Sequence, residues 1–471
     1  MGKKFDTKVQ YLKYKVLREV ARLARKDALL ENVTEIPKTI VPGKTPTMRC
    51  CVYKERAILN ERVKLAIGGN RFNKKVIQVI DIACDDCPTG GYEVTSACRG
   101  CLAHRCEESC RRGAITFGSD QKASIDKSKC VECGMCAKTC PYKAIINYKR
   151  PCEGSCRVKA ISVGEGKEAV INYDKCTACG ACVYTCPFGA ITDRSYILDV
   201  CDMLFSRSEN TAKVYALLAP AFAAQFDYAK PGQVIAAIKK LGFDAVADVA
   251  EGADITARAE ADELEEKGFL TSSCCPAFVS YIEKNFPSMK DKISHNLSPA
   301  GATAKILKER EPDCKAVFIG PCTAKKTEFQ RDEYKNLIDS VITFEELQAL
   351  IDGADIDIGA LESEEFCNSS RYGRGFAKSG GVSAAVKKAL EDKGSAFEVR
   401  PVICSGLDEC RVALIKAERG LLTENFIEGM ACAGGCVGGA GCLTHVESNV
   451  ARLDKYAVSG KEELCDDIKS L

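Results

Sequence analysis

The stretch CVECGMCAKTCP, residues 130–141, carries four cysteines at the spacing C-x2-C-x2-C-x3-C-P, and residues 176–187 repeat that spacing as CTACGACVYTCP. In this pattern three thiolates hold one 4Fe–4S cubane, and the fourth reaches a second cubane. The pattern is very specific because both the ligands and the proline are fixed in position. These two stretches therefore predict a fold built around iron–sulfur clusters.

A shorter repeat extends this cluster-binding region. Ala-Ile follows a cysteine by four residues in CRRGAI, CPYKAI, CRVKAI and CPFGAI, which begin at residues 110, 140, 156 and 186. Four ferredoxin half-units are indicated. The first is loosened to C-x2-C-x4-C-x3-C, and the third keeps only Cys152 and Cys156. Cys84 and Cys87 are candidates for its missing pair, and buried, unligated thiols are the alternative for those two.

The region thus predicts about four accessory 4Fe–4S clusters, and the ligand pairing stays open in the two less regular ones. The predicted ligands are Cys84, Cys87, Cys98, Cys101, Cys106, Cys110, Cys130, Cys133, Cys136, Cys140, Cys152, Cys156, Cys176, Cys179, Cys182 and Cys186.

Composition supports metal ligation. The 471 residues include 30 cysteines and only 3 histidines, which favours all-thiolate iron–sulfur chemistry over mixed zinc sites. The formal charge of +2 gives no global field that would attract nucleic acid or an anionic membrane. The sequence lacks a long apolar run and an apolar signal-peptide core, so we expect a cytoplasmic protein without a membrane segment.

We divide the chain into three units: an N-terminal helical or irregular segment (1–80), a ferredoxin-like 4Fe–4S domain of four half-units (81–198) and a third domain (199–471). The first segment begins with a basic amphipathic helix over 9–26, whose charged face we expect to be solvated, although docking to an acidic protein is an alternative. Cys50 and Cys51 have no spaced partner and are expected to be structural. The sequence does not indicate the function of this segment.

The third unit alternates apolar strands with alanine-rich helices. Buried strands are expected within 213–222, 315–322 and 397–406, and helices within 230–242, 345–353 and 381–394. This alternation predicts parallel-sheet lobes. The predicted fold class is therefore α/β multidomain, with ferredoxin-like α+β cluster domains followed by a two-lobed α/β domain.

Three cysteine loops follow apolar stretches in the third unit: TSSCCPAF (271–278), GPCTAKKTE (320–328) and EGMACAGGCVGGAG (428–441). Ligand sites favour the edge of an αβ sheet where strands end in turns. The loops supply enough thiolates for another cubane, on Cys275, Cys322, Cys432 and Cys436. Adjacent Cys274 and Cys275 leave the backbone in different directions, so they are not expected to share one metal centre.

These loops behind ferredoxin-like repeats resemble the iron-only (FeFe) hydrogenases over about 81–471. The resemblance implies an H-cluster, in which a 4Fe–4S cubane on the four cysteines joins a di-iron subcluster that carries CO, CN and azadithiolate ligands. By analogy Cys436 bridges the two parts.

The resemblance also assigns neighbours of the di-iron group. Lys325 is similar to the lysine that donates to a cyanide, the backbone of Ala219, Pro220 and Ala221 is similar to the loop around the other cyanide, and Met430 is expected to pack nearby. Lys326 is expected to be a surface lysine. Gly320 and Ala300 stand where well-known members carry methionine and glutamine, which suggests a divergent branch.

A proton path is implied as well. The resemblance makes Cys274 the terminal proton donor, with Glu260, Ser294 and Glu263 leading outward and Lys267 where members often carry arginine. Residues 256–268 read as a helix that ends at Gly268 and places the two glutamates and the lysine on one face. A solvated acidic helix is the alternative.

The function that the resemblance implies is reversible reduction of protons to H2, with electron transport through the 4Fe–4S clusters to or from ferredoxin or a similar low-potential carrier. Hydrogenase maturation proteins are then expected partners. Two alternatives stay open: a hydrogen-sensing relative, and an iron–sulfur assembly or scaffold protein that lacks the di-iron group.

Overall fold

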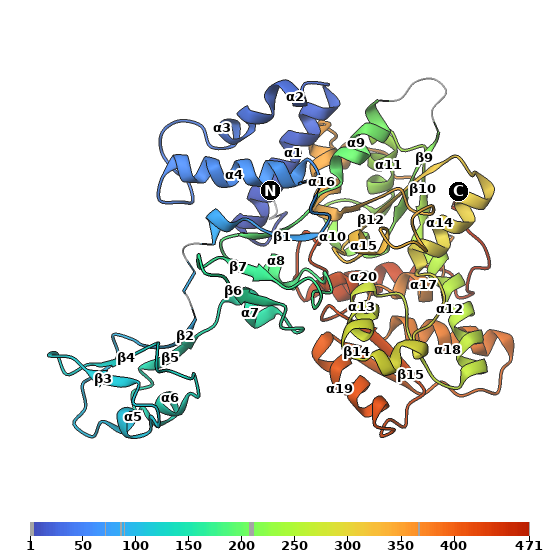
Figure 1. The fold of residues 1–471 in the computed structure, drawn as a ribbon. Helices are drawn as coiled ribbons and strands as arrows, with labels where there is room; N and C mark the ends of the chain where they lie inside the picture. The colour runs from blue at the N-terminus through green and yellow to red at the C-terminus, as the bar shows by residue number, and fades with distance from the viewer. Residues whose placement is uncertain are drawn as a thin grey trace.

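The computed structural model describes residues 4–70, 72–84, 87–88, 90–206, 212–365 and 368–470. Figure 1 shows a large α/β body, a layer of N-terminal helices on one side of it, and a small unit that extends from the body on narrow connections. Within the described residues, no helix is long and apolar enough to cross a membrane.

The N-terminal segment is helical, and its first helix is confirmed. Thr7 accepts a hydrogen bond from the Gln10 amide and caps the first helix, α1. One face of α1 is buried against α16 and α9 of the body, and Val16, Leu17 and Val20 belong to the main core. The helices of this segment are α1 (Lys8–Arg25), α2 (Leu29–Asn32), η1 (Val33–Glu35), α3 (Ile36–Ile40) and α4 (Val52–Ala66).

The two cysteines of this segment lie at the surface, and one of them has a structural role. Cys50 and Cys51 are both exposed. The Cys51 thiol accepts a hydrogen bond from the Lys54 amide and so caps α4, which is a local role that needs no burial.

The cluster-binding region repeats one small unit four times, as the Ala-Ile pattern predicted: a short helix, a cysteine, a turn and a strand. In every copy the cysteine Sγ accepts a hydrogen bond from the alanine amide four residues later, at 3.2–3.4 Å. The four helix–strand pairs are α5 (Arg105–Glu108) with β3 (Ile115–Phe117), α6 (Met135–Thr139) with β5 (Ile145–Tyr148), α7 (Pro151–Ser155) with β6 (Ile161–Val163), and α8 (Ala181–Thr185) with β8 (Ile191–Asp193).

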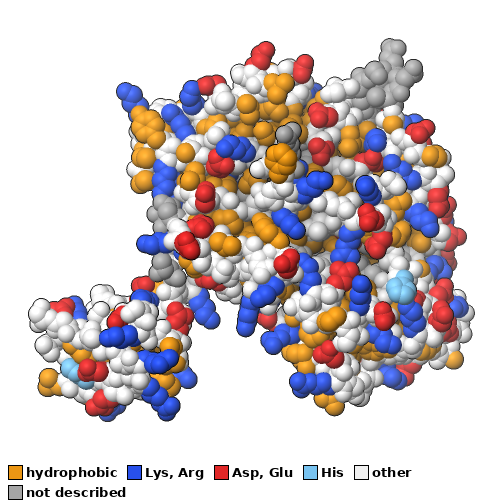
Figure 2. Space-filling view, in the orientation of Figure 1, with side chains coloured by type: hydrophobic (Ala, Val, Ile, Leu, Met, Phe, Trp, Pro, Cys, Tyr) orange, Lys and Arg blue, Asp and Glu red, His pale blue; other side chains and the backbone are white. Residues whose placement is uncertain are grey.

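The four copies form two separate units. The first two make a small domain with its own core, and this domain is the lobe that extends from the body in Figures 1 and 2. The other two lie beside the N-terminal helices, because β1 pairs with β8 and residues 76–80 join their core. The remaining strands here are β1 (Ile77–Val79), β2 (Gly91–Val94), β4 (Ala123–Ile125) and β7 (Ala169–Ile171), and the short 3-10 helix η2 (Asp81–Ala83) lies between β1 and β2. The division of the chain at 80/81 and 198/199 stays our proposal.

The body holds two parallel sheets, which confirms the two-lobed α/β fold. The first has the strand order β10-β9-β12-β13 and the second β11-β15-β14. The first comprises β9 (Val214–Leu218), β10 (Ala245–Asp248), β12 (Lys315–Gly320) and β13 (Ser340–Thr343). The second comprises β11 (Leu270–Thr271), β14 (Pro401–Ser405) and β15 (Phe426–Met430).

The expectation of a buried strand within 397–406 is wrong in one respect. The strand β14 exists, but Pro401 and Ile403 are exposed, because β14 lies at the edge of its sheet. The helices expected in this domain are confirmed as α11 (Pro231–Leu241), α16 (Phe344–Gly353) and α18 (Gly381–Lys393).

Further helices cover the sheets and position the cysteine loops. The helix α12 ends at Gly268, as expected, and the φ of 71° at this residue suits glycine. The helices are α9 (Ile197–Phe205), α10 (Phe222–Gln225), α12 (Val249–Lys267), α13 (Pro276–Asn285), η3 (Pro287–Lys292), α14 (Pro299–Arg310), α15 (Lys325–Glu328), η4 (Ile358–Ala360), α17 (Arg371–Gly375), α19 (Leu407–Glu418), η5 (Cys436–Gly438) and α20 (Ser448–Val458).

Candidate metal centre

Four cysteines from three distant loops line one cavity in the body. Cys275 caps the start of α13, Cys322 follows β12, and Cys432 and Cys436 follow β15. Parallel strands end at the same edge of a sheet, so loops far apart in sequence meet there. The structure thus brings together the four thiols that the sequence proposed as one ligand set.

The chemistry of this donor set fits an iron–sulfur cubane. Burial raises the pKa of all four thiols, that of Cys436 to about 12. Four buried thiols without a metal are therefore neutral, and a bound cation reverses this because a coordinating thiol is deprotonated. Among the described residues, no group of three or more His, Cys, Asp or Glu side chains is arranged to hold a single metal ion.

The remainder of the cavity wall is mostly apolar. Ala219, Pro220 and Ala221 come from the turn after β9, and Met430 ends β15. Lys325 is the one charged side chain among the described residues that line the cavity. A dry wall with a single cation suits a group that carries small anionic ligands.

Lys325 is held in place by two oxygen atoms. Its Nζ donates to Ser298 Oγ at 2.6 Å and to Glu328 Oε2 at 2.7 Å. Burial alone lowers the pKa of a lysine, but the Glu328 carboxylate more than offsets this and the pKa of Lys325 is raised. An ammonium has three protons, so one is left for a ligand in the cavity.

The two departures from the family pattern lie at this wall. A Cβ atom on Gly320 would stand 2.7 Å from two ring carbons of Phe318, so the Phe318 ring occupies the space that a side chain at position 320 needs. Phe318 and Ala300 both line the cavity. At this wall the chain thus has the Phe318 ring beside Gly320 and the short Ala300 side chain, where the family pattern has the longer side chains of methionine and glutamine.

Cys274 also lines the cavity but stands apart from the four-thiol set in its surroundings. Burial, followed by the nearby Glu260, raises its pKa well above the usual range, so it is a neutral thiol. Glu260 accepts hydrogen bonds on Oε1 from the Ser273 amide (3.0 Å) and hydroxyl (3.2 Å). Its Oε2 is buried without a hydrogen-bond partner, and burial raises its pKa to about 7. Near neutral pH the Cys274 thiol therefore carries a proton, and Glu260 exchanges one.

The outer half of the predicted path is also assembled. Ser294 Oγ donates to Glu263 Oε2 at 2.8 Å, and Lys267 Nζ donates to Glu263 Oε1 at 2.6 Å. Burial raises the pKa of Glu263, but its bonds to Lys267 and Ser294 outweigh this and lower the pKa overall. The predicted alternative, a solvated acidic helix face, does not describe Glu260, which is 0% exposed.

Sequence reasoning missed two residues between the halves of this path. Ser273 Oγ donates to the Asn296 carbonyl at 2.9 Å, and Asn296 Nδ2 donates to both Glu263 (2.8 Å) and Ser294 Oγ (3.1 Å). No hydrogen bond joins Glu260 directly to Ser294 in the described part of the chain. The signal for Ser273 was present, because it precedes the cysteine pair in TSSCCP.

The accessory thiols form sets in which the last cysteine of each half-unit crosses to its neighbour. Cys110 lines one cavity together with Cys130, Cys133 and Cys136. Cys140 acts electrostatically on Cys106, whose other neighbour is Cys101.

The second unit repeats this exchange. Cys156 acts on Cys182 together with Cys179 and Cys176. Cys186 and Cys84 act on Cys152, which supports Cys84 as a member of the fourth set. We therefore propose that Cys87 completes that set and that Cys98 completes the set of Cys101, Cys106 and Cys140.

One accessory set lies directly beside the four-thiol cavity. Cys179 acts electrostatically on Cys432, one of the cavity thiols. Thr323, next to Cys322, donates to the Ala178 carbonyl at 2.8 Å, and Lys284 of α13 donates to the Cys176 carbonyl at 2.6 Å. This contact is the junction between the cluster-binding region and the body.

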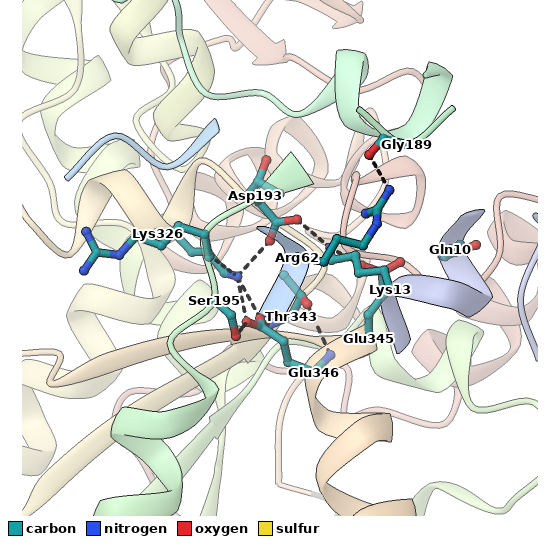
Figure 3. Close-up of polar contacts among 12 residues, drawn as sticks. Gln10, Lys13, Arg62, Gly189, Asp193, Ser195, Lys326, Thr343, Glu345 and Glu346 are labelled. Atoms are coloured by element: carbon teal, nitrogen blue, oxygen red, sulfur yellow. Dashed lines mark hydrogen bonds and ion pairs between the residues drawn. The ribbon is translucent and has the colours of Figure 1, made fainter. Parts of the chain in front are cut away.

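The expectation that Lys326 is a surface lysine is wrong. Its side chain is 0% exposed and donates to Asp193 Oδ2 (2.8 Å), Glu346 Oε1 (2.9 Å) and the Arg194 carbonyl (2.9 Å). Figure 3 shows this ammonium between carboxylates from β8 and α16. Lys325 and Lys326 are consecutive residues of the short helix α15, but they have different neighbours. Lys325 borders the cavity, whereas Lys326 links β8 to α16.

Comparison with known families agrees with this geometry. Residues 212–440 match the family described as iron only hydrogenase large subunit, C-terminal domain. Residues 169–192 match a 4Fe–4S binding domain, and residues 97–144 match a 4Fe–4S dicluster domain.

Hydrogenases and iron–sulfur cluster assembly factors are both among the similar proteins. Iron hydrogenase 1 of Clostridium pasteurianum is 31% identical over 258 residues, which cover 45% of each protein. Cytosolic Fe-S cluster assembly factor NAR1 of Kluyveromyces lactis is 36% identical over 110 residues, which cover 22% of this chain and 24% of that protein. The chain matches only about half the length of hydrogenases such as the clostridial one.

A solved structure of FeFe hydrogenase HydA1 from Chlamydomonas reinhardtii aligns with 56% of this chain and 88% of its own, at 23% identity and a TM-score of 0.48. The family predicted from the three cysteine loops is confirmed by the domain matches. Residues 212–440, which follow 4Fe–4S domains, thus belong to the iron-only hydrogenase family.

Proposed function

We propose that the protein is an iron-only hydrogenase that interconverts protons, electrons and H2. The observation that carries this proposal is Cys274: a half-buried, neutral thiol that lines the four-thiol cavity and has the buried carboxyl of Glu260, with a pKa raised to about 7, beside it. A cluster site that only stores iron needs four ligands. A fifth thiol with a carboxyl behind it is suited to moving protons.

The cavity residues hold the cofactor in this proposal. Cys275, Cys322, Cys432 and Cys436 would hold the cubane, and Cys436 would connect it to the di-iron subcluster. When bound, that subcluster would supply a low-potential iron centre for the interconversion of two protons and two electrons with H2. Lys325 would donate its third N–H as a hydrogen bond to an anionic ligand there, and the apolar wall would keep water away from the site.

Protons reach the cavity along the residues described above. Glu263 takes up a proton at the surface end, the Ser294 hydroxyl passes it on toward Glu260, and Glu260 reprotonates Cys274. Asn296 and Ser273 position these groups through their hydrogen bonds. The unpartnered Oε2 of Glu260 is the atom free to exchange a proton with the thiol. A carboxyl with a pKa of about 7 can both give and accept protons under physiological conditions.

Electrons travel through the accessory clusters. Cys133 is exposed, whereas the other fifteen accessory thiols are buried or half-buried, so the set of Cys110, Cys130, Cys133 and Cys136 is the entry point for a carrier. The exit is the junction of Cys179 with Cys432. The hydrogen couple near pH 7 lies at about −0.41 V, close to the roughly −400 mV of plant-type ferredoxins, which favours ferredoxin or a similar low-potential carrier as the partner.

A cytoplasmic location and dependence on hydrogenase maturation proteins complete this proposal. The second candidate function is iron–sulfur cluster assembly without hydrogen chemistry. It is favoured by the similarity to NAR1 proteins and by the altered wall at Phe318 and Ala300. A hydrogen sensor is a variant of the first function with slow turnover.

Infrared spectroscopy and turnover separate these functions. The chain is produced together with the proteins that build the di-iron group, and a hydrogenase is expected to show carbonyl and cyanide bands and to produce H2 from reduced ferredoxin. Bands with very slow turnover identify a sensor. Intact 4Fe–4S clusters without any bands identify an assembly protein and exclude the proposed function.

A further inference from the structure

The start of the chain, Asp6 and the helix α1, contacts the body near the cluster-binding region in two places. The first place is a buried ion network. Lys13 Nζ donates to Asp193 Oδ1 at the end of β8 (2.5 Å) and to Glu345 Oε2 in the first turn of α16 (2.6 Å). Lys326 shares Asp193 from the other side, at 2.8 Å from Oδ2 (Figure 3). One aspartate is thus held by two lysines from different parts of the chain.

The second place is a histidine that follows the cavity loop. His445 donates its backbone amide to Asp6 Oδ2 at 2.7 Å, and its Nδ1 lies 3.0 Å from the same oxygen. The His445 ring packs against Tyr184 of α8, with centroids 3.9 Å apart, and its Nε2 lies 2.9 Å from the Gly439 carbonyl. Gln10 adds a buried hydrogen bond to the Cys442 carbonyl at 2.7 Å.

These two places flank the electron junction. Asp193 ends the strand that follows Cys186, and Lys326 lies four residues after Cys322. Tyr184 lies between Cys182 and Cys186, and His445 follows the loop of Cys432 and Cys436. Both contacts therefore bear on the loops that meet at the junction, where Thr323 bonds the Ala178 carbonyl and Cys179 acts electrostatically on Cys432.

We propose that the N-terminal helix is a clamp that fixes the electron-transfer distance between the last accessory cluster and the cavity, and that Lys13 is its positioning residue. The inference rests on the electron relay proposed above. Electron tunnelling falls steeply with distance, so loosening these loops slows transfer without touching any ligand.

The charges explain why Lys13 is decisive. Asp193, Glu345, Glu346, Lys13 and Lys326 form the buried network, with three carboxylates facing two ammonium groups. Without Lys13, Glu345 loses its ammonium partner and Asp193 keeps only Lys326. An uncompensated buried carboxylate draws in water, and the packed loops open.

The test uses the full chain loaded with its 4Fe–4S clusters and measures amide hydrogen exchange. Lys13→Met is expected to speed exchange about tenfold in 178–195 and 439–445, while 96–148 keeps the wild-type rate. Lys13→Arg is expected to restore slow exchange, since it keeps the charge. Lys8→Met is the matched control, because Lys8 is an exposed lysine on the same helix.

A second variant guards against a general folding defect. Asp6→Ala removes the contact to His445 and leaves the ion network intact, so it is expected to speed exchange in 439–445 alone. In matured protein, ferredoxin-driven H2 production is expected to fall in Lys13→Met while the infrared bands keep their intensity.

Two results would overturn the clamp. One is exchange in Lys13→Met that matches Lys8→Met, with Asp6→Ala also unchanged. The other is acceleration spread evenly over the whole chain in both Lys13→Met and Asp6→Ala. Absence of H2 production and infrared bands from the wild type refutes the proposed function instead, and the exchange result still decides whether the clamp exists.

Discussion

The cluster-binding region and the cavity region both use four-cysteine sets, but they build them in opposite ways. In the cluster-binding region most of a set comes from one short loop, as in 130–136, and one thiol there, Cys133, is exposed. In the cavity the four thiols come from loops at 275, 322 and 432–436, and burial raises the pKa of all of them. Local ligand sets suit a relay that only passes electrons. A set assembled from distant loops around a mostly apolar cavity suits chemistry that must exclude water.

The largest effect is expected at the cavity lysine. Lys325→Ala removes the cation from a dry wall and leaves Glu328 without its ion-pair partner, so the di-iron group should not be incorporated or retained. Infrared carbonyl and cyanide bands, measured on matured protein, should disappear, and H2 production with them. Lys335→Ala, at an exposed lysine, is the control. Wild-type bands and activity from Lys325→Ala would show that the two regions differ less than proposed.

The next effect is expected on the proton path. Cys274→Ser and Glu260→Gln should each lower H2 production by about 10²–10⁴-fold, because neither replacement can take up and release a proton near neutral pH. The infrared bands should stay, since neither residue is a proposed ligand. Glu266→Gln changes an exposed glutamate on the same helix and should keep wild-type turnover. Near-normal production from both path variants would leave Cys274 without a role in proton transfer.

A smaller effect is expected in the cluster-binding region. Cys133→Ala should disrupt the exposed cluster and lower ferredoxin-driven turnover about tenfold or less, since the rest of the relay survives. The infrared bands should not change, because this cluster lies in a separate unit. Arg111 and Arg112 line the same cavity and are exposed, so charge reversal at both should raise the KM for an acidic ferredoxin. Loss of the infrared bands in folded Cys133→Ala protein would contradict the division between relay and site.

The smallest effect is expected when a change of pH alters the protonation of Glu260. Burial raises the pKa of Glu260 to about 7, so the folded protein holds a proton there that an unfolded chain loses above the usual glutamate range. Stability from this site therefore declines as the pH rises from about 4.5 to about 7 and is constant above that. An infrared band of a protonated carboxyl, absent from Glu260→Gln, should fade as the pH rises through about 7. A band that fades near pH 4.5 would show that this carboxyl is solvated.

The same contrast explains what the sequence could predict. The accessory clusters could be predicted because each half-unit is a local sequence pattern. The Ala-Ile pair also has a physical cause, since the alanine amide donates a hydrogen bond to the cysteine Sγ four residues earlier. The parallel sheets could be predicted from the alternation of apolar strands with alanine-rich helices. The four cavity cysteines could be proposed from three cysteine loops that each follow an apolar stretch, whereas the di-iron group and the role of Cys436 needed the family resemblance.

What the sequence could not predict depends on contacts between units. Lys326 stands next to Lys325 in a charged stretch, and only the fold shows that it points to Asp193 and Glu346 rather than to solvent. Lys13 and His445 take part in junctions with residues more than 100 positions away. Such long-range pairs leave no local pattern, so the N-terminal segment was not interpretable before its contacts were seen.

Exchange of deuterium between D2 and solvent protons is the most direct measurement of the central claim, because it reports hydrogen activation at the cavity without any electron carrier. Matured wild-type protein should catalyse the exchange, and Cys274→Ser should lose it by at least about a hundredfold while it keeps the infrared bands. Matured wild-type protein that carries intact 4Fe–4S clusters and catalyses no exchange would contradict the assignment of hydrogen chemistry to this site.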